Sequence, residues 1–244
     1  ALKHGNKSVD LHERVLKLDP SYHDAYMTVG VYHYVVGSLP FAVKILVALG
    51  GVKGSRKEGL AELERAATSA RRVGDDARVI LISLYARENR LADSLETLRQ
   101  LKAKYPANYV VSLEEANTLV RLKRYDEAYE VFDRLLANPR ASADAKDYVA
   151  YAYGEALKRG GRFERALAAY EQVWSWPKAD RDLITLARLG AGEAHDALGQ
   201  RKEATANYDL VLKREDVLDS RRRAGKYKKE PYTPSSPMAS TGQL

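Results

Sequence analysis

The strongest constraint on how this chain folds is a recurring spacing of small and aromatic residues. Ala116 precedes Ala128 by twelve residues, with Tyr125 between them, Phe132 four residues after Ala128, and Pro139 closing the unit. Two helices cross closely only where both carry a small side chain, and aromatic rings then fill the space beside the crossing. The spacing therefore predicts two helices joined by a tight turn.

Two further copies of this spacing follow towards the C-terminus. Each keeps a small residue on both helices and an aromatic residue on the second: Gly154, Phe163, Ala166, Tyr170 and Pro177, and then Gly192, Arg201, Ala204 and Tyr208. The pattern resembles the tetratricopeptide repeat, a helix–turn–helix unit of about 34 residues. The resemblance implies an all-α fold, an α-solenoid in which stacked repeats form a right-handed superhelix. The small residues expected at close crossings are Gly30, Gly59, Ala116, Ala128, Gly154, Ala166, Gly192 and Ala204.

The repeats divide the chain into three parts. Residues 1–20 resemble the second helix of a repeat whose first helix is missing, and residues 216–244 form a polar end. Between them, residues 21–215 form the predicted solenoid, with units at about 22–72, 75–106, 110–139, 144–177 and 182–214. The later repeats are longer by four residues each, so we expect loops or added helical turns at 140–146 and 178–182.

An apolar segment, residues 39–49, interrupts the first complete repeat. Pro40 stands near its start, where a helix tolerates proline, so we expect an additional short helix. The side chains that make this segment apolar nearly all round are Phe41, Val43, Ile45, Leu46, Val47 and Leu49. A helix of this kind is usually buried, and its length suits a core helix, so we expect burial. The alternative is a surface element that contacts a membrane or a partner.

Positive charge is concentrated near the C-terminus. The net charge is +7, and six positive charges come from a run without acids: Arg221, Arg222, Arg223, Lys226, Lys228 and Lys229. Because 7 − 6 leaves +1, the rest of the chain is nearly balanced. Residues 216–224 are predicted to form a polar capping helix, which the end of a solenoid needs. From Gly225 onwards, prolines, serines and threonines without an apolar period predict disorder and mobility.

The sequence contains no group of residues typical of an enzyme or a metal site. The absence of cysteine excludes disulfides, thiolate metal ligands and cysteine nucleophiles. The five histidines form no His-x-x-x-His pair, and the paired glycines lie at predicted helix ends rather than in phosphate-binding loops. We interpret His33 and His195, which lie at equivalent places in their repeats, as half-buried structural residues. We therefore predict no catalytic residue, no metal and no cofactor.

The compartment is left open by the sequence. No apolar run approaches the roughly 18 residues that a membrane span needs. The chain starts at Ala1 rather than Met, and nothing before Asp10 has the pattern of a signal peptide. We expect a fragment or a processed form.

The first helices of tetratricopeptide repeats line a concave groove that holds partners. As a family, the best-understood grooves clamp a partner's C-terminal carboxylate with lysine, asparagine and arginine. Carried onto this chain, the lysine places are Met27, Val79, Leu113, Tyr151 and Leu189. The asparagine places are Val31, Ser83, Asn117, Glu155 and Glu193. Only Asn117 matches, so the resemblance implies a groove without the carboxylate clamp.

The groove predicted for this chain is apolar with mixed charge. Its expected residues are Tyr34, Val79, Arg87, Leu113, Asn117, Tyr148, Tyr151, Glu155, Lys158, Arg159, Leu189 and Glu193. Tyrosine gives rigid contact area and a hydroxyl group, which suits a binding surface. The alternative for Tyr148 and Tyr151 is packing against the preceding repeat. Such a groove favours an apolar or aromatic-bearing segment over an acidic chain end.

We predict a non-catalytic scaffold that binds a peptide or protein partner in this groove. One alternative is binding of nucleic acid or another anionic surface through the basic run. Another is a structural subunit that self-associates through its open repeat ends or the apolar insert. A separate prediction concerns Glu115, whose equivalents are Leu81, Tyr153 and Ala191. We expect Glu115 to be partly buried and paired with a basic or hydroxyl side chain, because an unpaired buried charge is costly.

Overall fold

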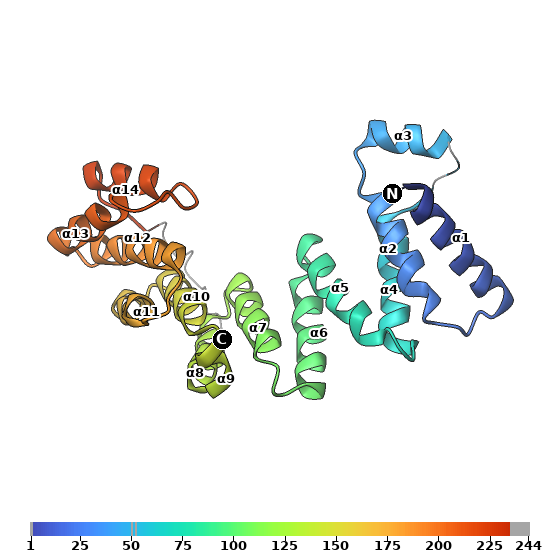
Figure 1. Ribbon diagram of the computed structural model, residues 1–244, viewed down its shortest axis with the longest axis horizontal. Coiled ribbons are helices and arrows are strands. Elements are labelled where there is room, and N and C mark those ends of the chain that lie inside the picture. The colour runs from blue at the N-terminus through green and yellow to red at the C-terminus, as the bar shows by residue number, and fades with distance from the viewer. Residues whose placement is uncertain (1, 50, 52, 235–244) are drawn as a thin grey trace, which may run out of the picture. The chain divides into compact units, whose positions relative to one another are not determined.

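The computed structural model describes residues 2–49, 51 and 53–234 of the 244-residue chain. These residues form fourteen helices and no strand, and consecutive helices pack in pairs (Figure 1). The predicted all-α repeat architecture is confirmed. The chain divides into two compact units, Ala1–Lys104 and Tyr105–Leu244, each with its own packing. None of the helices in the described part of the chain combines the length and the apolarity needed to cross a bilayer.

The first unit is built around the close pair α2 and α4. Helix α1 packs on α2, and α5 joins α4 to α6. The bounds are α1 Leu2–Leu18, α2 Ala25–Gly37, α3 Phe41–Leu49, α4 Arg56–Ser69, α5 Gly74–Arg87 and α6 Leu91–Lys104. Ser55 begins α4 as the predicted cap, because its side chain accepts a hydrogen bond from the backbone N–H of Glu58.

The second unit continues the repeats and ends in an additional helix. Its bounds are α7 Tyr109–Arg121, α8 Tyr125–Ala137, α9 Pro139–Asp144, α10 Lys146–Arg159, α11 Phe163–Ser175, α12 Arg181–Ala197, α13 Arg201–Leu212 and α14 Ser220–Lys229. The short α9 occupies the predicted insertion at 140–146. Helices α7, α10 and α12, the first helices of their repeats, are neighbours, and α14 packs on α12 and α13.

Four helix–helix turns share one backbone geometry. The residue with positive φ in each turn is Asn89, Lys123, Gly161 or Gly199. The next backbone N–H then donates to the carbonyl five residues earlier, as from Arg90 to Tyr85 and from Gln200 to His195, both at 2.8 Å. This is the Schellman end of a helix, in which a left-handed residue reverses the chain. The recurrence of one turn at one place identifies the helix pairs as copies of a unit.

Small residues stand where the helices of a pair come closest. A Cβ atom added at Gly154 would lie 2.5 Å from a ring carbon of Tyr170. A Cβ atom added at Gly59 would lie 2.5 Å from the carbonyl oxygen of Gly30 across the α2–α4 crossing. Neither separation is compatible with a side chain, so both crossings require glycine. The alanines at the other crossings have no exposed surface: Ala116, Ala128, Ala166 and Ala204.

The inserted helix forms where it is predicted, but the expectation of burial is wrong for the side chains that are described. In α3, Phe41 is 80% exposed, Ile45 49% and Val43 39%. The predicted apolar side chains of Leu46, Val47 and Leu49 lie outside the described residues.

The reason is that α2 and α4 close directly on each other beneath the insert. A Cβ atom added at Gly37 would lie 2.3 Å from the backbone nitrogen of Arg56. The two helices therefore leave no space between them for the side chains of α3. The insert instead projects beyond the ends of α2 and α4 (Figure 1).

The C-terminal helix also differs from its prediction. It begins at Ser220 and continues to Lys229, so disorder from Gly225 onwards is wrong for residues 225–229. Ala224 is fully buried against α12 and α13, and Tyr227 lies with its ring 5.9 Å from that of Tyr208. Residues 235–244 of the predicted tail lie outside the described residues.

Glu115 faces the interior of its repeat. Its exposed fraction is 6%, which agrees with the predicted burial and with the apolar residues at equivalent places in other repeats. The identity of the group that it pairs with stays a prediction.

Candidate functional site

A cleft of about 320 Å³ lies between α7 and α10 in the second unit. Helix α7 contributes Asn117 and Arg121, one turn apart, with Val120 beside them. Helix α10 contributes one face at helical spacing, comprising Tyr148, Tyr151, Ala152, Glu155, Ala156 and Arg159. Because both helices are the first of their repeats, the cleft lies on the side of the repeats that the sequence predicts to bind a partner.

Five residues predicted for the groove line this cleft: Asn117, Tyr148, Tyr151, Glu155 and Arg159. The sequence analysis missed Val120, Arg121, Ala152 and Ala156. Val120 and Arg121 follow Asn117 by three and four residues, and Ala152 follows Tyr148 by four, so helical spacing from the predicted residues would have located these three. Ala156 in turn follows Ala152 by four.

The other predicted groove residues lie elsewhere. Tyr34, Leu113, Lys158, Leu189 and Glu193 are each 9% exposed or less, so they belong to the packed interior rather than to an open surface. In the first unit, Tyr34 donates a hydrogen bond to Glu88 at 2.9 Å. Also in that unit, Val79 and Arg87 are exposed on α5, outside the cleft.

The carboxylate in the cleft is already committed to protein groups. Glu155 Oε1 accepts hydrogen bonds from Lys158 Nζ at 2.8 Å and from the Tyr170 hydroxyl at 2.6 Å. Burial opposes ionisation of Glu155, but Lys158 and Tyr170 outweigh it and lower its pKa below the ordinary value. Glu155 is therefore ionised at neutral pH. Its hydrogen bonds to Lys158 and Tyr170 hold its side chain in place on the α10 side of the cleft.

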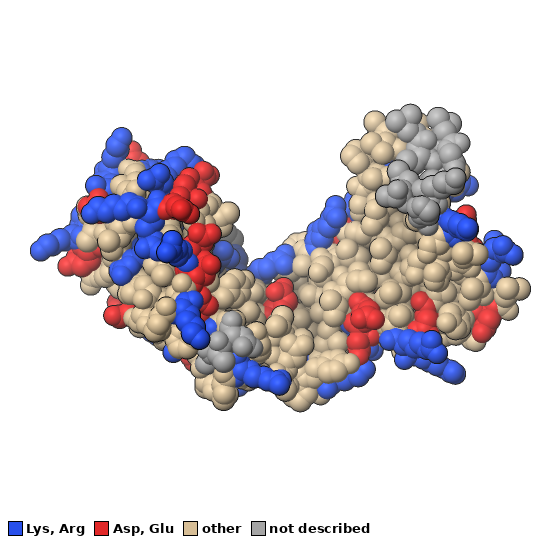
Figure 2. Space-filling view, viewed as in Figure 1, with Lys and Arg blue, Asp and Glu red and all other residues tan. Residues whose placement is uncertain are grey.

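A chain of alternating charges connects this carboxylate to the C-terminal helix. Lys158 also donates to Glu193 Oε2 at 2.6 Å, and Arg223 of α14 donates to Glu193 Oε1. Burial opposes the charge on Lys158, yet Glu155 and Glu193 together raise its pKa. The negative charges of Glu155 and Glu193 are thus balanced by the positive charges of Lys158 and Arg223. Figure 2 shows both signs of charge gathered over α12, α13 and α14.

The groups that remain available in the cleft are aromatic and cationic. Tyr148 is 44% exposed. Arg159 forms no hydrogen bond or ion pair with any described residue. Tyr151 packs at 6.4 Å from the Tyr170 ring, and burial raises its pKa to about 12, so it stays a neutral hydroxyl. This arrangement suits contact with a flat apolar or aromatic group beside a hydrogen-bond acceptor.

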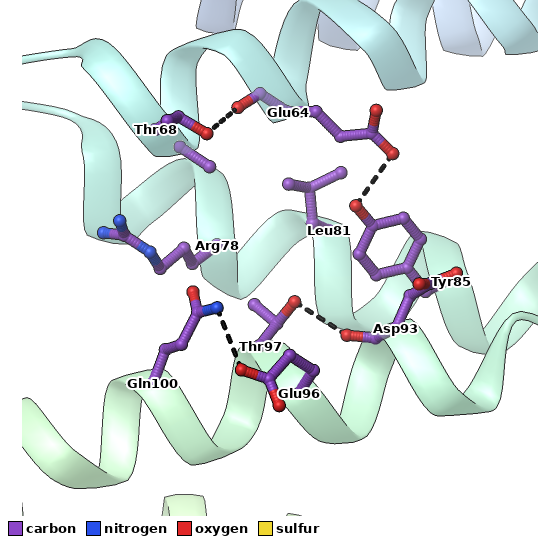
Figure 3. A pocket seen from close by; sticks show the side chains of 10 residues that line it. Glu64, Thr68, Arg78, Leu81, Tyr85, Asp93, Glu96, Thr97 and Gln100 are labelled. Atoms are coloured by element: carbon purple, nitrogen blue, oxygen red, sulfur yellow. Dashed lines mark hydrogen bonds between the residues drawn. The ribbon is translucent and has the colours of Figure 1, made fainter.

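A second pocket, of about 220 Å³, lies between α4, α5 and α6 in the first unit (Figure 3). Its polar groups bond one another: the Tyr85 hydroxyl donates to Glu64, and Gln100 donates to Glu96. Arg78 is bound by Asp75 at 2.7 Å. The polar side chains of this pocket therefore already have hydrogen-bond partners within the protein. The α7–α10 cleft is the stronger candidate for binding a ligand.

The two histidines at equivalent repeat positions, His33 and His195, each lie beside a polar side chain. His33 Nδ1 lies 2.7 Å from Glu62, and His195 Nδ1 lies 2.6 Å from Gln200. His33, Glu58 and Glu62 are the one group of potential metal ligands in the described part of the chain, with ligand atoms within 4.8 Å of one another. The bond to Glu62 already occupies Nδ1 of His33, and Glu58 is exposed.

Solved structures with this fold are tetratricopeptide repeat proteins. The protein YrrB, described as having an unusual peptide-binding site, superposes with a TM-score of 0.58 at 14% identity, covering 89% of this chain and 97% of its own. PilF of Pseudomonas aeruginosa has a TM-score of 0.52 at 15% identity and 92% coverage of both chains. A thermophilic repeat protein of Thermus thermophilus has a TM-score of 0.50 at 20% identity, covering 75% of this chain and 93% of its own.

No family model and no curated protein matches the sequence. At identities of 20% or below, the similar structures establish the fold alone.

Proposed function

We propose that this chain, a helical repeat protein with the tetratricopeptide fold, is a non-catalytic scaffold that binds a segment of a partner protein in the α7–α10 cleft. The observation that carries the proposal is one face of α10, on which Tyr148, Tyr151 and Arg159 border an apolar floor. Proteins of this fold serve as protein-interaction scaffolds. The peptide-binding site ascribed to YrrB adds support, because that structure covers most of this chain.

The chemistry of the cleft favours an apolar or aromatic side chain on the partner. Val120, Ala152 and Ala156 offer small apolar contacts, and the two tyrosines offer rigid rings. Glu155 Oε1 already accepts hydrogen bonds from Lys158 and Tyr170, so this carboxylate is paired within the protein. Arg159 suits a backbone carbonyl of the bound segment. With only Asn117 at a clamp place, a C-terminal carboxylate is not the favoured ligand.

Binding of nucleic acid through the basic run is less favoured by the contacts of α14. Arg223 and Lys228 pair with Glu193 and Asp209, and Arg222 pairs with Asp219. Three of the six cations of the run are thus paired with carboxylates, which reduces the positive charge available to neutralise phosphates. Self-association stays an alternative, and light scattering of the full chain addresses it.

The proposal is tested with peptides selected by display on the full chain. Binding is then measured by fluorescence polarisation for the wild type, Tyr148→Ala and Tyr22→Ala. Tyr22 is the matched control, because it is 46% exposed against 44% for Tyr148 but lies in the first unit. Loss of an aromatic anchor is expected to weaken binding at least about tenfold in Tyr148→Ala and not in Tyr22→Ala. Equal binding by the two variants would contradict the proposal that the peptide binds in the α7–α10 cleft.

A second arm tests the chemistry of the ligand. An acidic C-terminal peptide and its amidated form are compared on the same protein. We expect weak binding of both and little dependence on salt, since apolar contacts are not screened. Tight binding that amidation abolishes would contradict the proposed preference.

A further inference from the structure

The inserted helix α3 presents apolar side chains to solvent without a partner in the described part of the chain. Phe41 is 80% exposed and Ile45 49%. Exposed apolar residues are ordinary when scattered singly, but a cluster on one projecting helix marks an interaction site.

The charged side chains of α3 and of the segment that follows it as far as Lys57 are all positive, and the first carboxylate after them is Glu58 in α4. Residues 39–57 contain Lys44, Lys53, Arg56 and Lys57 and no acidic residue. Arg56 pairs with Glu88 at 3.1 Å, whereas Lys53 and Lys57 are exposed and form no ion pair with the described residues. An apolar tip with a cationic flank complements a surface that is apolar below a layer of anionic groups.

We propose that α3 binds the surface of an anionic phospholipid membrane, with Phe41 and Ile45 inserted and with Lys53 and Lys57 at the headgroup phosphates. Nine residues give a helix of about 13 Å, less than half of the roughly 30 Å of a bilayer core. The helix therefore lies in the interface and does not span the membrane. Such binding is reversible, because a short apolar surface and a few charges act together.

Two other occupants of α3 fit less well. The first unit itself offers no place, since glycines bring α2 and α4 into direct contact below the insert. A second copy of the chain would bring the cationic flanks of two inserts together, which costs electrostatic free energy. A bilayer needs no shaped groove, which suits a helix whose sequence is apolar nearly all round.

The test is flotation of the full chain with phosphatidylcholine vesicles, with and without phosphatidylserine. The wild type is expected to float with the anionic vesicles only, and less at high salt. The double variant Phe41→Ser with Ile45→Ser is expected to lose at least about tenfold in binding. Val79→Ser is the matched control, because Val79 is 58% exposed on α5 and lies away from the insert.

The substituted side chains are largely exposed, so the variants should melt like the wild type. Equal flotation of the double variant and the control would overturn the proposal, as would equal binding to neutral vesicles. A lipid-independent dimer that the double variant abolishes would assign α3 to a second copy and also overturn it. Peptide binding in the α7–α10 cleft should be unchanged by these substitutions, so the two proposals fail separately.

Discussion

The inserted helix α3 and the terminal helix α14 show that the more apolar of two helices need not be the one that packs against its neighbours. Helix α3 has the sequence FAVKILVAL, with one charge, and its described apolar side chains are exposed. Helix α14 has the sequence SRRRAGKYKK, with six positive charges, and it packs on α12 and α13. The difference shows that burial depends on the surface available to a helix as well as on its own composition.

The docking of α14 is explained by what α12 and α13 offer it. Glu193 accepts from Arg223, and Asp209 accepts from Lys228. Arg201 donates to the carbonyls of Tyr227 and Lys228, which satisfies the C-terminal end of the helix. Among the residues that the structure describes, no such surface faces α3, because α2 and α4 are already closed on each other.

The largest expected difference in stability is between a variant without α14 and a variant without α3. Truncation after Asp219 removes Ala224, Tyr227 and Arg223 from the second unit, and we expect a loss of about 3–5 kcal/mol with a melting temperature several degrees lower. Replacement of residues 41–49 by a Gly-Ser linker should leave the melting temperature nearly unchanged. Calorimetry of both variants makes the comparison, and a larger loss from the α3 replacement would reverse it.

Removal of residues 235–244 alone is the control for the truncation. We expect no change in the melting temperature, because the contacts of α14 with α12 and α13 are all retained in that variant. A drop as large as that of the longer truncation would place the stabilisation outside α14.

A smaller effect is expected from a single cation of α14. Arg223→Met leaves the buried carboxylate of Glu193 with Lys158 alone, and breaking a buried pair costs about 3–5 kcal/mol. Because the Arg223 side chain is 39% exposed, we expect a loss of about 2 kcal/mol after screening by solvent. Arg222→Met is the matched control, since Arg222 pairs with Asp219 on the surface and its loss should not shift the melting temperature measurably. Similar changes in melting temperature for the two variants would show that the ion pair with Glu193 does not stabilise the fold more than a surface pair does.

The smallest effect is a difference between the units in response to acid. Lys158 and Tyr170 outweigh burial and lower the pKa of Glu155, so its stabilisation is present above the ordinary value of 4.5 and is lost as the pH falls. Burial raises the pKa of Glu62 despite His33, so protonation of Glu62 adds stability as the pH falls.

Melting at about pH 6 and pH 4 measures this difference. The loss of stability on acidification should be smaller in Glu155→Gln than in the wild type, and larger in Glu62→Gln. Parallel shifts in both variants would show that the two carboxylates respond alike.

The helix pairs and their crossings were predictable, because the spacing from Ala116 to Ala128 and from Gly154 to Ala166 is local and periodic. Five of the nine residues that line the cleft were predictable for the same reason, since most of them, such as Tyr148, Tyr151 and Glu155, share one helix face. The burial of Glu193 was not, because its partner Arg223 lies thirty residues away in a segment without apolar period. A hydrogen-bond partner at that separation leaves no trace in the spacing.

The exposure of α3 could not be predicted from its composition either. Its burial would have required space between α2 and α4, and Gly37 and Gly59 remove that space through contacts with residues on the other helix. Whether a site exists to bury α3 depends on how α2 and α4 pack on each other. The spacing of apolar residues within 39–49 carries no information about that packing.

Hydrogen–deuterium exchange of the full chain tests most directly whether the polar helix α14 is docked while the apolar helix α3 is not. Backbone amides of residues 220–229 are expected to exchange more slowly than those of residues 41–49, although α14 is the more polar helix. Faster exchange in α14 than in α3 would contradict the account, because it would show that the basic helix is not held by Glu193 and Asp209 in solution.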